Sequence, residues 1–225
     1  MATTDRRLID LSHTIEGGMI TYKGLPAPVL CDYLSRAESR EHYDEGTEFH
    51  IAELTLVANT GTYIDSPYHR YADGKDVSDF DLEEVAGLDG VVVRAAGGTG
   101  RAIGHRAFSS VDLRGKAVLV YTGWDRHWRT DRYFEGHPFL TADAAACLHD
   151  AGVRLVGIDS LNIDDIADGR RPVHTTLLGA GIPVVEHLCG LDQLPSDGFR
   201  FYAVPVKVKG MGSFPVRAFA MLDAA

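Results

Sequence analysis

Residues 59–69 read Asn59-Thr60-Gly61-Thr62-Tyr63-Ile64-Asp65-Ser66-Pro67-Tyr68-His69. Gly61 allows a tight backbone turn, and Pro67 fixes the chain just after the one acidic residue of the run. The carboxylate of Asp65 and the imidazole of His69 are therefore expected to lie close together on a stiff loop. Metal binding and proton transfer both require side chains held with few degrees of freedom. The run predicts a functional site.

The segment ahead of this run, residues 51–58, is rich in apolar side chains. Glu53 and Thr55 alternate there with Leu54 and Leu56, which is typical of a half-buried strand. We expect this strand to lead directly into the site.

The composition is that of a globular protein. A chain of 225 residues is long enough for one domain with its own core, spanning residues 1–225. The net charge of −10, without a basic cluster, argues against nucleic-acid binding. No run approaches the ~20 apolar residues of a membrane helix. The first residues lack the apolar region of a signal peptide, so we predict a cytoplasmic protein without membrane partners.

Short apolar segments outnumber helical patterns along the chain. Strands are predicted at residues 7–10, 50–58, 90–94, 117–121, 155–158, 183–185, 201–206 and 217–221. Helices are predicted at residues 82–85 and 143–151, the second with Thr141 as its cap and Gly152 as its end. The strand-helix-strand order from 118 to 158 favours a mixed α/β domain.

Residues 59–69 closely resemble the signature of the cyclase family, which includes bacterial kynurenine formamidases and isatin hydrolases. The motif of that family is His-x-Gly-Thr-His-x-Asp-x-Pro-x-His. Its Gly, Thr, Asp, Pro and last His are present here, but Asn59 and Tyr63 replace the first two histidines.

Further segments resemble family elements in the same order along the chain. They are Asp10-Leu11-Ser12-His13, Thr122-Gly123-Trp124 with His137-Pro138, Gly157-Ile158-Asp159-Ser160 with Asn162-Ile163-Asp164, His174 with residues 177–186, and a closing stretch around 205–217. The resemblance implies a swivelling β/β/α domain, with a β-barrel-like core flanked by helices. It also implies a homodimer or homotetramer.

In metal-bearing relatives two ions share the motif aspartate, and the last motif histidine is an acid-base group. Carried over, the resemblance supplies Asp65, His174 and Glu186 as ligands of one ion. Asn59 and Tyr63 would be poor ligands at the other position, because an amide oxygen and a neutral phenol donate weakly. One divalent ion, Zn or Mn, is therefore expected, and the usual two-ion centre is not.

The candidate site residues fall into three groups. The catalytic candidates are His69, Asp65 and Tyr63; the substrate-binding candidates are Asn59, Trp124, His13 and His137; the metal candidates are Asp65, His174 and Glu186. Structural alternatives stand beside these roles. Asp65 and His69 could stabilise a turn, His174 and Glu186 could form a buried pair, and Tyr63 and Trp124 could be core aromatics.

Three functions remain open at this level. The leading hypothesis is hydrolysis of a cyclic or linear amide, resembling isatin hydrolase or kynurenine formamidase, the arylformamidase of tryptophan catabolism that converts N-formylkynurenine to kynurenine and formate. Water would be activated by the retained ion or by His69. The alternatives are a metal-independent cyclase, dehydratase or lactone-acting enzyme using His69, Asp65 and Tyr63, and a non-catalytic protein that binds a small molecule.

Overall fold

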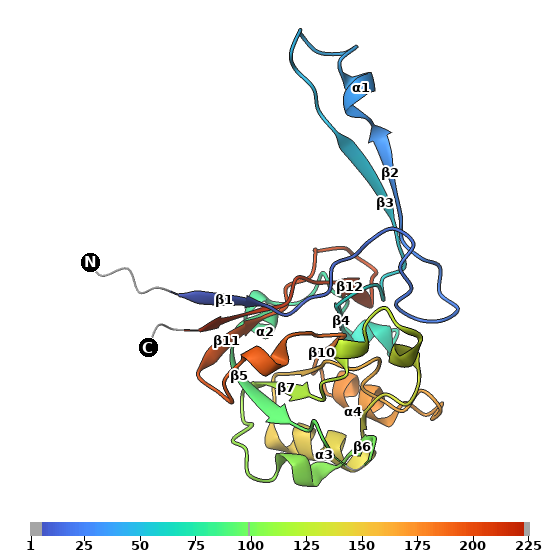
Figure 1. Cartoon of the computed structure of the whole chain (residues 1–225). Helices are drawn as coiled ribbons and strands as arrows, with labels where there is room; N and C mark the ends of the chain where they lie inside the picture. Colours follow the sequence, from blue (N-terminus) through green and yellow to red (C-terminus); the bar gives the residue numbers. More distant parts are fainter. Residues whose placement is uncertain (1–5, 99, 223–225) are drawn as a thin grey trace, which may run out of the picture.

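A computed structural model describes residues 6–98 and 100–222 of the chain. Nine strands form one mixed sheet that curls into a half-barrel (Figure 1). In sheet order they are β1 (Arg7–Asp10), β13 (Phe219–Leu222), β11 (Phe199–Tyr202), β5 (Ala86–Arg94), β7 (Ala117–Tyr121), β9 (Leu155–Ile158), β10 (Val184–Glu186), β4 (Tyr63–Asp65) and β12 (Ser213–Pro215). This mixed α/β half-barrel, flanked by few helices, confirms the predicted fold class.

The middle of the sheet is parallel and buried. Strands β5, β7, β9 and β10 pair in parallel, and their Val-rich and Leu-rich runs have side chains in the core on both faces. Helices α3 (Ala142–Ala151) and α4 (Pro172–Gly179) contribute to the core on one face. The antiparallel strands β1, β13 and β11 contribute to the core on the other.

Smaller elements complete the body. The short helix α2 is Leu82–Val85, and a minor parallel pair consists of β6 (Ala102–Ile103) and β8 (Phe139–Leu140). The 3₁₀ turns are η1 (Pro67–His69), η2 (His105–Phe108), η3 (Asp125–His127), η4 (Asp131–Phe134) and η5 (Leu191–Gln193). None of the helices within 6–98 and 100–222 is long and apolar enough to span a bilayer.

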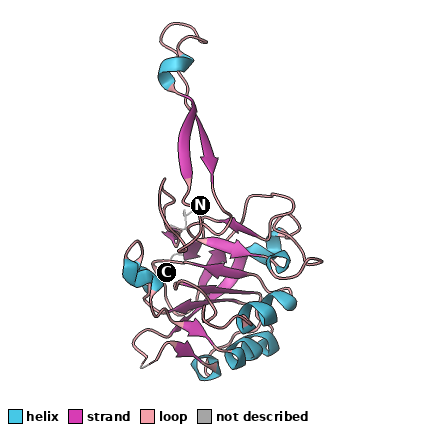
Figure 2. Ribbon diagram, turned by 90° about the vertical axis from the view of Figure 1, so that its right-hand side faces the viewer, coloured by secondary structure: helices cyan, strands magenta, loops and turns pink. Residues whose placement is uncertain are grey.

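A hairpin arm projects from the body at the end opposite α3 (Figures 1 and 2). It consists of β2 (Val29–Leu34), the short helix α1 (Arg36–Ser39) and β3 (Ile51–Thr55), with β2 and β3 paired antiparallel. We use "arm" below for residues 29–55. Both strands expose their side chains on both faces.

The arm corrects one expectation. The segment predicted as a half-buried strand leading into the site is a strand only from Ile51 to Thr55, and it lies on the arm. Polar and apolar residues do alternate along this strand, but no other element of the described residues packs against either face of it. The strand that carries the motif is instead β4, which follows after a loop.

Most other predicted elements are confirmed, with shifted ends. The helix at 143–151 begins one residue earlier, and Gly152 ends it with a φ of +70°. Thr141 occupies the cap position, but its hydroxyl contacts the side chain of Asp143 instead of a helix N–H group. Helix α4, which begins with Pro172, was not predicted, although proline is a common first residue of a helix.

Candidate active site

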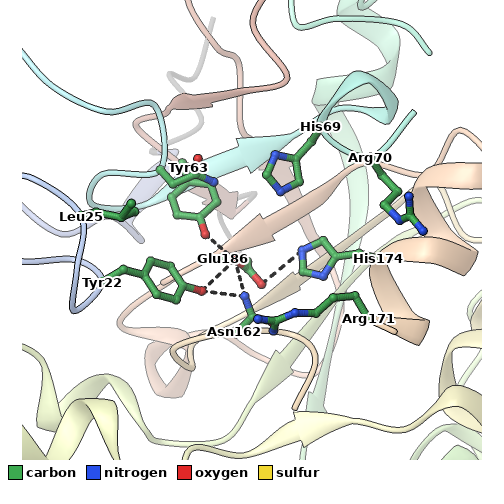
Figure 3. A pocket seen from close by; sticks show the side chains of 10 residues that line it. Tyr22, Leu25, Tyr63, His69, Arg70, Asn162, Arg171, His174 and Glu186 are labelled. Atoms are coloured by element: carbon green, nitrogen blue, oxygen red, sulfur yellow. Dashed lines mark hydrogen bonds and ion pairs between the residues drawn. The ribbon is translucent and has the colours of Figure 1, made fainter. Parts of the chain in front are cut away.

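The two strands that carry the main candidates are neighbours in the sheet. Strands β4 and β10 pair antiparallel, so that Tyr63 lies opposite Glu186 and Asp65 lies opposite Val184. Because side chains alternate along a strand, Tyr63 and Asp65 point to the same face. Turn η1 and helix α4 add His69 and His174 there. Tyr63, His69 and His174 border a cavity of about 250 Å³, whereas Asp65 is buried and does not line it. The cavity is lined by Tyr22, Leu25, Asn59, Tyr63, His69, Arg70, Asn162, Arg171, His174 and Glu186 (Figure 3).

Asp65 is fully buried, and its two carboxylate oxygens differ. Oδ1 accepts a hydrogen bond from the hydroxyl of Ser213. Oδ2 has no hydrogen-bond partner among the described residues, and the nearest cationic group is His174, whose Nε2 lies 3.5 Å away. Burying a carboxylate oxygen without a partner costs free energy of folding, so a cation is expected next to Oδ2 of Asp65.

His174 is aimed at Asp65 by a second carboxylate. Its Nδ1 lies 2.6 Å from Oδ2 of Asp164. Oδ2 also accepts the backbone N–H of His174, and Oδ1 of Asp164 accepts the backbone N–H of Val173. Burial disfavours the charged imidazole, but the contacts with Asp164, Asp65 and Glu186 outweigh it and raise the pKa of His174 to about 10. A carboxylate behind the imidazole is the usual partner of a metal-ligating histidine.

The two carboxylate oxygens of Glu186 have different partners. Its Oε2 accepts from the phenol of Tyr63 and from the amide of Asn162 at 3.3 Å. Its Oε1 accepts the N–H of Ile163 at 2.7 Å and lies 3.6 Å from Nε2 of His174. Burial raises the pKa of Glu186 to about 7, and the pKa of Tyr63 is raised well above its usual range. Tyr63 is therefore a neutral donor to Glu186.

His69 lies at the rim of the same site, with its side chain 38% exposed. Its Nδ1 is 2.9 Å from the hydroxyl oxygen of Ser213. That hydroxyl has one proton, and the acceptor-only carboxylate of Asp65 takes it, so Nδ1 of His69 must be the donor toward Ser213. In the neutral ring, Nε2 is then left as the unprotonated nitrogen. Nδ2 of Asn59 also donates to Ser213, at 3.3 Å.

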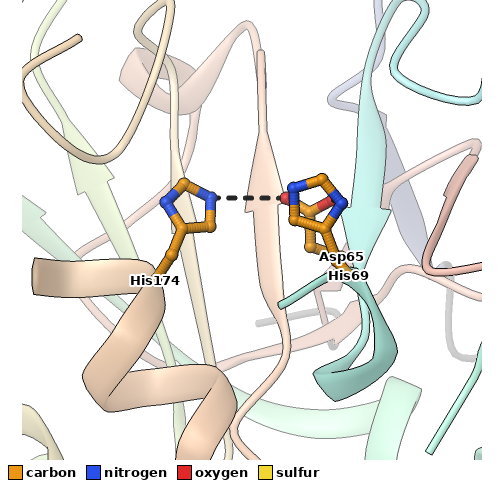
Figure 4. A group of neighbouring side chains, drawn as sticks. All are labelled: Asp65, His69 and His174. Atoms are coloured by element: carbon orange, nitrogen blue, oxygen red, sulfur yellow. Dashed lines mark ion pairs between the residues drawn. The ribbon is translucent and has the colours of Figure 1, made fainter. Parts of the chain in front are cut away.

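Three of these side chains form a compact cluster of possible ligands. One ligand atom each from Asp65, His69 and His174 lies within 4.8 Å of the others (Figure 4). Glu186 adjoins the cluster through His174. The structure thus brings together the predicted catalytic residues and the predicted metal residues in one place.

The predicted substrate-binding residues are dispersed. Asn59 lines the cavity, whereas His13, Trp124 and His137 do not. His13 stacks on Trp128 at 4.0 Å between ring centroids, and the indole N–H of Trp124 donates to the carbonyl of Tyr133. His137 is buried, with Nε2 at 3.0 Å from the carbonyl oxygen of Asp164.

Several residues of the site were missed in the sequence. Asn162 and Asp164 belong to a segment that resembles the family, and Arg70 directly follows His69, so their positions were signalled even though their roles were not. The phenol of Tyr22 accepts from Asn162 at 2.6 Å and donates to the carbonyl of Leu161. Ser213 lies within the closing stretch that resembles the family, although no role was predicted for it, and Tyr22 lies outside every segment that the sequence singled out.

Comparisons with known proteins agree with this picture. A family model described as a cyclase matches residues 9–165. The chain is 28% identical over 211 residues to a kynurenine formamidase of Bacillus cereus, covering 93% of this chain and 95% of that protein. It is 31% identical over 176 residues to a kynurenine formamidase of Geobacillus thermodenitrificans, covering 77% and 81% of the two chains.

Solved structures share the fold. Isatin hydrolase A from Labrenzia aggregata, bound to benzyl benzoate, superposes with a TM-score of 0.83 at 22% identity, covering 97% of this chain and 94% of that one. A structure described as a potential metal-dependent hydrolase with cyclase activity superposes with a TM-score of 0.73 at 25% identity, covering 96% and 98%.

Proposed function

Because this chain belongs to the cyclase family, we propose that it is an amidohydrolase that cleaves a cyclic or linear amide of a small molecule with water. The observation that carries the proposal is the buried cluster of Asp65, His174 and Glu186 with His69 at its rim. The kynurenine formamidases among its relatives support an amide as the scissile group.

One divalent ion, Zn or Mn, fits the residues present. Two ligands about 2.1 Å from a tetrahedral ion lie roughly 3.4 Å apart. Nε2 of His174 lies 3.5 Å from the unpaired Oδ2 of Asp65 and 3.6 Å from Oε1 of Glu186. Oδ2 of Asp65 and Nε2 of His174 would hold the ion, and Oε1 of Glu186, which lies outside the group of possible ligand atoms within 4.8 Å of one another, would move toward them to join as the third ligand. When bound, the ion would polarise the amide carbonyl and lower the pKa of a water molecule toward ~7.

His69 is the group best placed to move protons. It is part-exposed at the rim of the cavity, and Ser213 fixes its Nδ1 as a donor. Its Nε2 would accept a proton from the attacking water and return it to the leaving amine. Tyr63 and Asn162 hold Glu186 in place through hydrogen bonds to Oε2, so Oε1 remains directed toward His174.

A substrate screen tests the function. We expect purified protein supplied with Zn or Mn to hydrolyse at least one member of a panel of aryl formamides and isatins, and a chelator to abolish that activity. Activity that persists in chelator would favour the metal-independent enzyme. Inactivity across the panel and a matched set of lactones, measured with ion-loaded protein, would favour the binding protein. Cytoplasmic residence remains a prediction from the sequence.

The ion content can be predicted from Asn59 and Tyr63. We expect at most one ion per chain after dialysis, because these residues replace two imidazoles beside Asp65 with weak donors. The double substitution Asn59→His with Tyr63→His should raise the content toward two. Elemental analysis measures both, with His149→Asn as a control at an exposed histidine. Two stoichiometric ions in the wild type would contradict the prediction.

We also propose that the protein is a homo-oligomer, most simply a dimer assembled through the arm. An isolated two-stranded hairpin is marginally stable in water, and large exposed apolar side chains commonly mark an interface. The arm exposes Val29, Leu30, Tyr33, Tyr43, Phe49, Ile51 and Leu54. A second copy related by two-fold symmetry would bury the same surface on both chains.

Leu30 and Leu54 provide the test of assembly. They are directly paired across the arm, so they lie on one face, and they are 51% and 52% exposed within a single chain. We expect Leu30→Glu with Leu54→Glu to convert a dimer to a folded monomer, as measured by light scattering and circular dichroism. Leu82→Glu, at an exposed leucine on α2, is the control. A wild-type monomer at micromolar concentration would overturn the proposal.

A further inference from the structure

Two arginines line the cavity on the side of His174. Arg171 is half-buried and runs beneath His174 toward Asn162, whose side-chain oxygen lies 3.1 Å from its Nη1 (Figure 3). Arg70 is exposed, and its Nε donates to the hydroxyl of Thr175 at 3.3 Å. Within the described ranges, neither guanidinium forms an ion pair, although the chain carries a net charge of −10. Two uncompensated cations therefore face a cavity of an acidic protein.

The backbone of Arg171 is strained. Its φ of +49° and ψ of +59° place it in the left-handed region, where glycine is favoured and an arginine next to a proline is not. Such conformations persist where the surrounding structure holds them, and they concentrate at functional sites. The strained conformation keeps a long cationic side chain over the cavity, where glycine would leave none.

The nearby acidic groups already have partners. Asp164 accepts the first N–H groups of α4, so the helix end offers no free donors there. Asp168 is held by Arg170 through two contacts of 2.9 Å, and Asp165 lies 3.5 Å from Arg101. The guanidinium of Arg171 therefore has no carboxylate partner among the described residues, and its charge is available to bind an anionic ligand.

From this arrangement we infer that Arg171, assisted by Arg70, recognises a carboxylate on the substrate, so that the cavity selects anionic amides. The inference rests on the proposed function for the identity of the scissile group. The buried carboxylates of Asp65 and Glu186 repel an anion from the floor of the cavity, while the guanidinium groups attract it to the rim. A substrate with both groups would therefore bind with its carboxylate at Arg171 and its amide beside His174.

Binding of benzoate and benzamide tests the recognition without chemistry. These planar ligands differ by one charge, and ion-free protein prevents direct ligation of the carboxylate to a metal. We expect calorimetry to show roughly 10- to 100-fold tighter binding of benzoate, the factor that one charge-assisted hydrogen-bonded pair contributes. Arg171→Gln should abolish the preference, and Arg171→Lys should retain part of it. Arg106→Gln, at an exposed arginine outside the cavity, should leave it unchanged.

A glycine substitution separates recognition from structure. Arg171→Gly removes the guanidinium but relieves the left-handed backbone, so we expect an equal or higher melting temperature together with loss of the benzoate preference. Equal affinities for the two ligands, no detectable benzoate binding at millimolar concentration, or an equal loss in Arg106→Gln would overturn the inference.

The inference and the proposed function fail differently. If the wild type prefers benzoate through Arg171 but hydrolyses no amide, the proposed function fails and the recognition of an anion stands. If it hydrolyses formanilide and 2-carboxyformanilide with equal kcat/KM, and Arg171→Gln changes neither, the inference fails and the hydrolase stands.

Discussion

Replacing Asp65 with asparagine should abolish stoichiometric ion binding and lower turnover by about 10³-fold or more. Oδ2 of Asp65 is the buried oxygen that has no hydrogen-bond partner among the described residues, and it faces Nε2 of His174. An asparagine keeps the size of the side chain and an acceptor for Ser213 but removes the charge. Stabilisation by a metal is worth several kcal/mol, and each 1.4 kcal/mol is about tenfold in rate.

The Asp65→Asn protein should still fold. Removing one buried carboxylate lowers the pKa of His174 toward its usual value, because Asp65 is one of the groups that raise it. Elemental analysis, turnover and melting temperature together test the prediction. Asp89→Asn, an exposed carboxylate on β5, is the control. A variant that retains one ion per chain and wild-type turnover would exclude Asp65 as a ligand.

Replacing His69 with glutamine should lower turnover by about 10²–10⁴-fold while ion content and fold remain unchanged. General acid-base catalysis contributes a factor of this size, and imidazole is the side chain suited to it near neutral pH. Glutamine can still donate to Ser213, so the hydrogen bond that orients Asp65 is retained. His149→Gln, on the exposed face of α3, is the control.

Turnover and ion content, measured together on His69→Gln, distinguish a proton-transfer role of His69 from a role as a metal ligand. Its ring belongs to the cluster of possible ligands with Asp65 and His174. Loss of both the ion and the activity in His69→Gln would make it a ligand. Unchanged turnover would leave it a structural residue of the turn.

The sequence predicted the parts of the site that depend on local geometry. Asp65 and His69 are four residues apart around Pro67, and the structure holds both beside Ser213. The approach of His174 and Glu186 depends on how β10 pairs with β4 and how α4 packs against β10 and η1, and only the family resemblance indicated it.

The missed features are contacts between distant segments. Tyr22 reaches a carbonyl 139 residues further along the chain, and Ser213 contacts Asp65 across 148 residues. No local pattern encodes such pairs. The arm was missed because alternation of polar and apolar residues reports a strand but not what covers it.

The phenol of Tyr63 donates to Glu186 and stands where relatives have a metal-ligating imidazole. This replacement bears on how enzymatic activity would depend on the concentration of free ion. A centre that needs two ions is active only when both positions are filled, so at low free ion its active fraction falls with the square of the ion concentration. A chain that binds one ion, as proposed for this one with a phenol and an amide in place of two imidazoles, would have an active fraction that falls only in proportion to the ion concentration. Asn59 and Tyr63 would thus determine how steeply activity depends on the concentration of free metal ion.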